Sequence, residues 1–166
     1  MPEQTWYALY VKSRCEKKVA VEFEIDGVDY YLPLIKKLKQ WSDRKKWVEE
    51  PLFRSYIFVN IEQKQYYDIL QTQNVVKYIS FEGKAVPIRK EQIEAVKYFL
   101  NEKDPENIDN QIWEEGQKVE VISGSLAGLK GELIEVRGKK KVKVEIEVVG
   151  KTLIIQIPKS KLQFIL

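Results

Sequence analysis

The chain has 166 residues, of which 44% are hydrophobic and 32% are charged, and its formal net charge is +3. That composition is typical of a globular protein and too apolar for a disordered chain. Histidine is absent and Cys15 is the only cysteine, which excludes an internal disulfide, a zinc site of cysteine and histidine, and histidine-assisted catalysis. We therefore expect a protein that is not an enzyme, with no catalytic residues, no metal and no cofactor.

The sequence predicts a cytoplasmic protein with two domains. Its apolar runs are shorter than the roughly 18–20 residues of a membrane-spanning helix, and residues 1–5 lack the basic and apolar regions of a signal peptide. Residues 1–101 carry a net charge of +3, residues 102–113 carry −3 and residues 114–166 carry +3. Because the middle stretch is acidic and contains Pro105, it is typical of a linker.

The first part has the pattern of a mixed α/β domain. Residues 6–11 are aromatic and β-branched, which predicts a strand. Ser13, followed three residues later by Glu16, is typical of the capping box of a helix, and Gly27 predicts its end. Three apolar positions recur at helical spacing within it: Cys15, Val19 and Phe23.

The middle of this part predicts a β-hairpin with a basic tip. Residues 29–41 are extended and aromatic, polar turn residues 42–46 follow, and residues 47–48 resume the extended pattern. The remaining elements, in order, are a buried strand over 55–59, a helix over 63–70, a strand over 75–79, and a helix after Pro87 with Ile93, Val96 and Leu100 on one face. This order predicts an α+β fold, an antiparallel sheet flanked by helices.

The last part has the pattern of a small all-β domain. Residues 118–121, 133–136 and 153–157 have the pattern of short strands. Residues 141–148 alternate polar and apolar side chains, as a half-buried strand does. Because the turns recur about every ten residues within roughly 50 residues, a small β-barrel is predicted.

Two sets of residues resemble the motifs of a known family. One set resembles the KOW motif: Gly116, Val119, Val121, Gly124, Leu126, Ala127, Gly128, Leu129 and Gly131. Residues 6–12 and 50–59 resemble the two signature strands of the NGN domain. Since order and spacing agree as well, the chain is identified as a member of the NusG family. The resemblance implies an NGN domain over 1–101, an acidic linker over 102–113 and a KOW β-barrel over 114–166.

Within that family the chain resembles the specialised RfaH and UpxY antiterminators more than general NusG. Arg54-Ser55 stands where general NusG usually has Pro-Gly. Gly124-Ser125-Leu126 and Val149-Gly150-Lys151 replace its Gly-Pro-Phe and Phe-Gly-Arg. Those aromatic positions help the general factor to bind Rho and a small-subunit ribosomal protein, so both contacts stay open here. The implied function is transcription antitermination, the processive elongation of selected operons.

The resemblance implies that the NGN domain binds the clamp helices of RNA polymerase and closes the polymerase cleft over DNA. Five matched positions are implied for this contact: Tyr7, Tyr10, Leu52, Phe53 and Tyr56. Such aromatic residues can each contribute about 2 kcal/mol or more to binding. Burial in the sheet is the other interpretation, and we favour it for Trp6, Ile57 and Val59. We favour contact for Tyr10, Phe53 and Tyr56.

Two basic groups are further candidates for contact. The hairpin tip is implied to face the gate loop of the other large polymerase subunit, through Trp41, Arg44, Lys45 and Lys46. A second group follows the first strand, near where the family meets the non-template DNA strand, and predicts phosphate contacts: Lys12, Arg14, Lys17 and Lys18. For each group the alternative is a solvated surface. Gln73-Asn74 stands where RfaH-type factors use an arginine, so no recruiting DNA sequence is implied.

Other functions stay open as alternatives. The chain could be a general NusG-type elongation and termination factor, or a KOW-type protein that binds the ribosome or RNA through Lys139-Lys140-Lys141. A net charge of +3 is low for a ribosomal protein, and the NGN motif would then be unexplained. We expect a monomer that does not bind membranes. The strict alternation over 142–148 favours a permanent barrel over the helical alternative of RfaH-type KOW domains.

Overall fold

The computed structural model describes residues 3–101, 116–136 and 138–165. Contacts divide the chain into two compact units, Met1–Ile88 and Arg89–Leu166. This division falls before the last predicted helix of the first domain, so the boundary at residue 101 stays a prediction. The predicted acidic linker over 102–113 lies outside the described residues. In the described ranges, none of the helices has the length and apolar character needed to cross a membrane.

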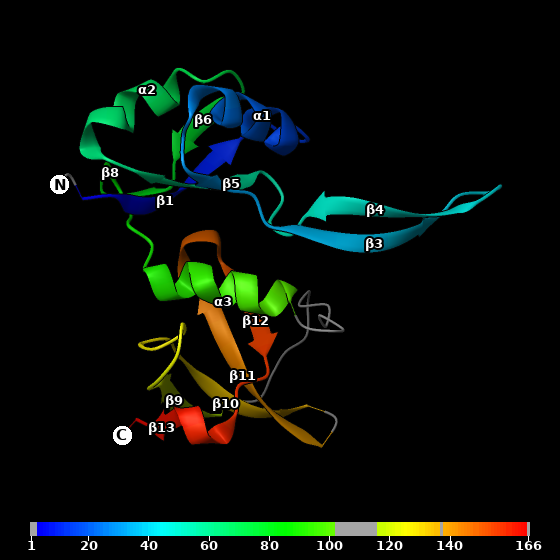
Figure 1. Cartoon of the computed structure of the whole chain (residues 1–166), viewed down its shortest axis with the longest axis vertical. Helices are drawn as coiled ribbons and strands as arrows, with labels where there is room; N and C mark the ends of the chain where they lie inside the picture. The colour runs from blue at the N-terminus through cyan, green and yellow to red at the C-terminus, as the bar shows by residue number, and fades with distance from the viewer. Residues whose placement is uncertain (1–2, 102–115, 137, 166) are drawn as a thin grey trace. The chain divides into compact units, whose positions relative to one another are not determined.

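The first unit is a sheet covered by helices on one face, with two separate two-stranded sheets (Figure 1). Its elements are β1 (Thr5–Val11), α1 (Glu16–Asp26), β2 (Tyr30–Tyr31), β3 (Leu34–Gln40), β4 (Lys45–Pro51), β5 (Tyr56–Ile61), η1 (Gln63–Gln65), α2 (Tyr66–Leu70), β6 (Val75–Tyr78), β7 (Ser80–Phe81) and β8 (Lys84–Ala85). The sheet has the order β2-β5-β1-β6, and β1 pairs antiparallel with both β5 and β6. Strand β1 therefore lies inside the sheet, and its side chains point alternately to the two faces of the sheet.

The helix-covered face holds the core of this unit. Leu9 and Val11 of β1 are fully buried, and they belong to one cluster with Val19 and Phe23 of α1. Ile69 of α2 belongs to the same cluster. Because side chains alternate along a strand, Tyr10, between Leu9 and Val11, points to the opposite face. The predicted burial of Val19 and Phe23 is confirmed.

Helix α1 begins later than the sequence suggests. The predicted capping box at Ser13 is wrong, because the helix begins at Glu16 with Cys15 as its N-cap residue. Arg14 has a left-handed φ of 63°, and the Cys15 N–H donates to the Lys12 carbonyl at 3.0 Å. A turn therefore reverses the chain directly after β1. The predicted end is confirmed, since Gly27 takes a left-handed conformation there.

The second unit contains a helix and a five-stranded antiparallel sheet. Its elements are α3 (Lys90–Leu100), β9 (Gln117–Val121), β10 (Lys130–Val136), β11 (Lys139–Ile146), η2 (Glu147–Val149), β12 (Lys151–Ile155), η3 (Lys159–Lys161) and β13 (Leu162–Phe164). The strand order is β12-β11-β10-β9-β13. Val142, Val144 and Ile146 of β11 are buried, as their alternation predicts. The mixed fold, with an N-terminal helix-covered sheet and a β-rich C-terminal unit, agrees with the predicted class.

The structure explains why residue 131 of the KOW-like motif is glycine. A Cβ at Gly131 would lie 2.6 Å from the Lys143 carbonyl oxygen and 2.8 Å from a methyl group of Val142. Both residues belong to β11. This strand pairs with β10, on which Gly131 lies. The close approach of these two strands therefore requires glycine at residue 131.

Candidate functional site

The sheet face away from α1 and α2 carries two tyrosines in contact. Tyr10 of β1 and Tyr56 of β5 are direct cross-strand partners. Their rings meet edge to face with centroids 5.9 Å apart, a favourable geometry for aromatic pairs. Tyr10 is 37% exposed and Tyr56 is partly exposed. We call this surface the Tyr10/Tyr56 face.

Phe53 lies in the core beside this face and not at the surface. It is only 1% exposed, and its ring meets that of Phe58 edge to face at 5.9 Å. Phe58 is itself buried and stacks on Tyr31 with centroids 6.4 Å apart. Leu52 is partly exposed, and its N–H donates to the Pro33 carbonyl at 2.9 Å. Of the predicted contact residues, Phe53 is therefore buried, whereas Tyr7, Tyr10, Leu52 and Tyr56 are at least partly exposed.

The structure separates Tyr7 from the other predicted contact residues. Its ring packs edge to face against Tyr66 and Tyr78, at centroid distances of 6.3 and 5.7 Å. It borders the cluster that contains Leu9, on the helix-covered face. Tyr78 donates its hydroxyl to the Tyr66 carbonyl at 2.7 Å, and burial raises its pKa. Tyr7 thus belongs to a packed tyrosine cluster and does not join the Tyr10/Tyr56 face.

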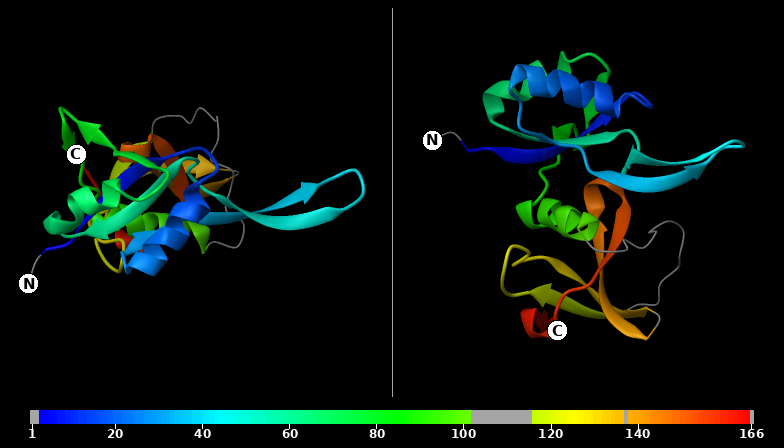
Figure 2. Two further views of the ribbon diagram at one scale, coloured as in Figure 1. Left: turned by 90° about the horizontal axis from the view of Figure 1, so that it is seen from above. Right: turned by 45° about the vertical axis from the view of Figure 1, so that its right-hand side comes forward.

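Strands β3 and β4, with residues 41–44 between them, form a hairpin that we call the arm. Its register runs from Leu34 opposite Pro51 to Gln40 opposite Lys45. The turn closes where the Trp41 N–H donates to the Arg44 carbonyl at 2.7 Å. Figure 2 shows the arm extending away from the helix-covered sheet of its unit in both views. The predicted basic hairpin is therefore confirmed as a structural element.

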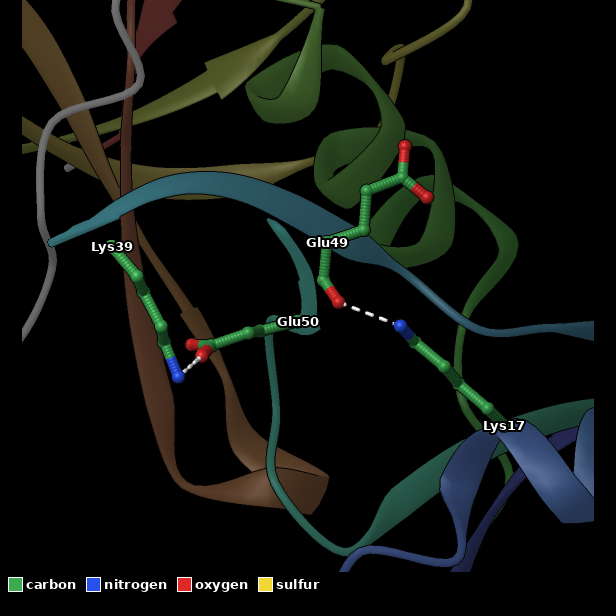
Figure 3. Close-up of polar contacts among 4 residues, drawn as sticks. All are labelled: Lys17, Lys39, Glu49 and Glu50. Carbon is green, nitrogen blue, oxygen red and sulfur yellow. Dashed lines mark hydrogen bonds and ion pairs between the residues drawn. The ribbon is translucent and has the colours of Figure 1, made fainter. Parts of the chain in front are cut away.

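Two lysine contacts support the base of the arm (Figure 3). The Lys17 ammonium of α1 donates to the Glu49 carbonyl of β4 at 2.7 Å. Within the arm, Lys39 forms an ion pair with Glu50. The hydrogen bond from Lys39 lowers the pKa of the Glu50 carboxyl. An isolated two-stranded hairpin is only marginally stable. The ion pair helps to stabilise the arm itself, and the Lys17 contact helps to hold it in one orientation.

The tip of the arm holds the four residues predicted to face the gate loop. The Arg44 guanidinium lies over the Trp41 ring, 5.5 Å from its centroid, a cation–π contact that orders both side chains. Lys45 and Lys46 are exposed at the start of β4. The structure therefore brings Trp41, Arg44 and both lysines together at one end of the arm.

The basic group after β1 is divided between two settings. All four side chains are exposed, but Lys17 also donates to a main-chain carbonyl of the arm. The Lys12 N–H donates to the Asn74 carbonyl at 2.9 Å, which brings the segment before β6 beside the turn after β1. A hollow between α1 and the segment before β6 is lined by Lys18, Val21, Glu22, Gln73 and Asn74.

Sequence reasoning missed two features of these surfaces. Trp47 is 64% exposed and lies opposite Leu38, which is 50% exposed, on one face of the arm. Their pairing follows from the hairpin register, which requires knowledge of the turn. The contact of Lys17 with Glu49 joins residues 32 positions apart, and no local pattern signals it.

Comparison with known proteins identifies the family. The family model described as "Transcription termination factor nusG" matches residues 4–97. The chain is similar to the protein named "Transcription termination/antitermination protein NusG" of Synechocystis sp. (strain ATCC 27184 / PCC 6803 / Kazusa), with 24% identity over 90% of this chain and 83% of the relative. It also resembles a solved structure titled "Domain interaction in Thermotoga maritima NusG", with a TM-score of 0.52, 21% identity and 98% of each chain covered. That likeness shows the fold.

The family match covers more than half of the chain, and it spans the sheet that carries the Tyr10/Tyr56 face together with the arm. Members of this family are transcription factors without enzymatic activity. The protein belongs to the NusG family.

Proposed function

We propose that the protein is a transcription elongation factor of the antitermination type, which binds the clamp helices of RNA polymerase through the Tyr10/Tyr56 face. The observation that carries the proposal is the exposed aromatic pair on the sheet face away from α1 and α2. Tyrosine combines a large apolar ring with a polar hydroxyl and loses little conformational freedom on binding. Such a pair suits a contact with a helical partner.

The other two surfaces extend the same proposal. The Trp41/Arg44 tip of the arm contacts the gate loop of the other large polymerase subunit, because a pre-ordered tryptophan and arginine are typical of interface centres. The exposed cations Lys12, Arg14 and Lys18 contact phosphates of the non-template DNA strand. The three surfaces together favour a closed, processive elongation complex.

Burial in the second unit supports the specialised type over the general one. Leu126 and Val149 stand where general NusG usually carries phenylalanines that help it to bind Rho and a small-subunit ribosomal protein. Both aliphatic side chains are buried, at 4% and 7% exposure. We infer that this unit binds neither partner in the way of the general factor.

Binding to the cognate core RNA polymerase tests the main contact. Tyr10→Ala and Tyr56→Ala should each weaken binding by about 2 kcal/mol, or roughly 30-fold, if they are hot-spot residues. Tyr67→Ala is the matched control, because Tyr67 is a highly exposed tyrosine on α2. Equal binding by all three variants would reject the Tyr10/Tyr56 face as the polymerase site.

Readthrough of terminators in vitro tests the antitermination type. We expect increased readthrough on templates from selected operons, with little effect on an unrelated template or on Rho-dependent termination. Uniform stimulation of Rho on all templates would instead support a general termination factor. Salt-sensitive binding to ribosomes or RNA, without binding to polymerase, would support the ribosomal alternative.

A further inference from the structure

The arm concentrates positive charge far above the average of the chain. Residues 36–47 contain six lysine or arginine residues and one aspartate, a net charge of +5, whereas the whole chain has +3. The two glutamates of the arm, Glu49 and Glu50, lie at its base. The distal part of the arm is therefore strongly cationic.

Several of these cations are available to a ligand. Lys36, Lys45 and Lys46 are exposed, and within the described residues none of the three forms an ion pair with a carboxylate. Lys39 differs because it pairs with Glu50, and Arg44 lies over Trp41. Unpaired lysines gathered on one element repel one another, and a polyanion relieves that repulsion.

The cations point to both faces of the ribbon. Alternation places Lys36 and Lys45 on the same face as Leu38 and Trp47. Lys46 is offset by one residue from Lys45 and therefore lies on the other face, with Lys37 and Lys39. The exposed pair Leu38 and Trp47 lies between Lys36 and Lys45 along the arm.

We propose that the arm binds double-stranded DNA, as a two-stranded ribbon in the major groove. The major groove of B-DNA admits a two-stranded β-ribbon, and a phosphate backbone borders it on each side. Both strands of the ribbon carry cations, and their long side chains can reach the backbones on either side. Seven residues per strand give the arm a length of about 20 Å, which spans about six base pairs.

Other nucleic acids match the arm less well. The major groove of double-stranded RNA is too narrow and deep for such a ribbon. Proteins that bind single strands combine a cationic groove with aromatic platforms for successive bases. The arm is a free ribbon, and Trp47 is the exposed aromatic residue along its strands.

This site is distinct from the single-strand contact proposed for Lys12, Arg14 and Lys18, and it does not depend on binding to polymerase.

The test is the affinity of the full chain for a fluorescent 30-base-pair DNA duplex, without polymerase, over a range of salt concentrations. Each phosphate contact contributes about −0.9 to the slope of log K against log salt. The triple variant Lys36→Gln, Lys45→Gln, Lys46→Gln should therefore flatten the slope by about 2.7 and weaken binding by about tenfold or more at low salt. A charge-matched control carries Lys64→Gln, Lys84→Gln and Lys90→Gln, all exposed positions outside the arm, and should keep the wild-type slope.

A second variant tests the apolar pair. Trp47→Ala should weaken duplex binding several-fold and leave the salt slope unchanged, because it removes a contact without removing a charge. A single strand and an RNA duplex of the same sequence should bind more weakly than the DNA duplex. The proposal is overturned if the single strand binds most tightly, if the triple variant keeps the wild-type slope, or if Lys12→Gln, Arg14→Gln, Lys18→Gln alone abolishes duplex binding. Since polymerase is absent, these outcomes are separate from the proposed polymerase contact.

Discussion

The Lys17 ammonium and the Glu49 main-chain carbonyl, 2.7 Å apart, join helix α1 to the arm. The acceptor is a backbone atom, so the contact depends on the position of β4 and not on the identity of the side chain at residue 49. A lysine predicted from the sequence to bind DNA phosphates thus serves as a positioning residue for the arm. The finding separates Lys17, which contacts the arm, from the other three basic residues after β1.

Replacing Lys17 should loosen the arm. Lys17→Met removes the donor and keeps most of the aliphatic side chain. We expect backbone amides of β3 and β4 to exchange hydrogen about fivefold faster, as the loss of roughly 1 kcal/mol from one hydrogen bond implies. Lys18→Met is the matched control on the same helix. Unchanged exchange in the arm of the Lys17 variant would show that other contacts hold it.

Phe53 should behave as a core residue in unfolding experiments. Phe53→Ala is expected to lower the free energy of unfolding of the first unit by about 3–4 kcal/mol, because it leaves a cavity against Phe58. Tyr10→Ala should cost about 1 kcal/mol, the scale of one aromatic pair. A urea titration followed by NMR signals of β1 and β5 measures both values. Similar losses for the two variants would contradict this separation of core from surface.

Ser55 should be replaceable by glycine with a gain in stability. Its φ is 69°, in the left-handed region that costs a non-glycine residue about 1–2 kcal/mol. Ser55→Gly should therefore raise the free energy of unfolding, by about 0.5–1 kcal/mol after the greater freedom of glycine in the unfolded chain is included. Ser13→Gly, at an exposed turn position without a positive φ, should give no gain. Denaturant titration of both variants makes the comparison, and an unstable Ser55→Gly variant would refute the strain argument.

The second unit should lose stability in acid through Glu132. A hydrogen bond from the Lys143 ammonium, at 3.1 Å, and another from the Gly116 N–H, at 3.3 Å, lower the pKa of the Glu132 carboxyl below its usual 4.5. A lowered folded-state pKa gives stability that is present above the unfolded-state pKa and is lost as the pH falls through the folded-state value.

Glu132→Gln should therefore flatten the acid limb of the stability curve below about pH 4.5 while the chain stays folded at neutral pH. Glu145→Gln, at an exposed position of β11, is the control and should retain the limb. Thermal unfolding measured from pH 3 to 7 provides the curves. An identical acid limb in wild type and Glu132→Gln would exclude this carboxyl as its source.

Local patterns predicted most of the fold because the decisive residues lie close in sequence. Gly27 ends α1 and the alternation over 142–148 marks β11, as the structure confirms. The paired strands β7 and β8 were missed, although the turn residues Glu82 and Gly83 both take positive φ. Gly83 was the available signal. Pro33 separates β2 from β3, so the predicted single extended stretch is two strands that belong to different sheets.

The candidate site was only partly predictable, because its residues depend on pairing between distant segments. Tyr7 and Tyr10 are three positions apart, and strand alternation alone places them on opposite faces. The burial of Phe53 depends on its contact with Phe58 across the turn before β5, which residue type does not reveal. The exposure of Trp47 and the contact of Lys17 with Glu49 depend on the three-dimensional position of the arm, which the sequence does not show.

The pairing of β9 with β13 sets an order in time for the chain as the ribosome makes it. Val121 pairs with Leu162, so the sheet of the second unit is incomplete until residues 162–164 have been synthesised. Every strand pair of the first unit is formed by residues up to Ala85. Because domains generally fold as units during synthesis, N-terminal first, the Tyr10/Tyr56 face and the arm can be complete on a nascent chain whose second unit is still unfolded.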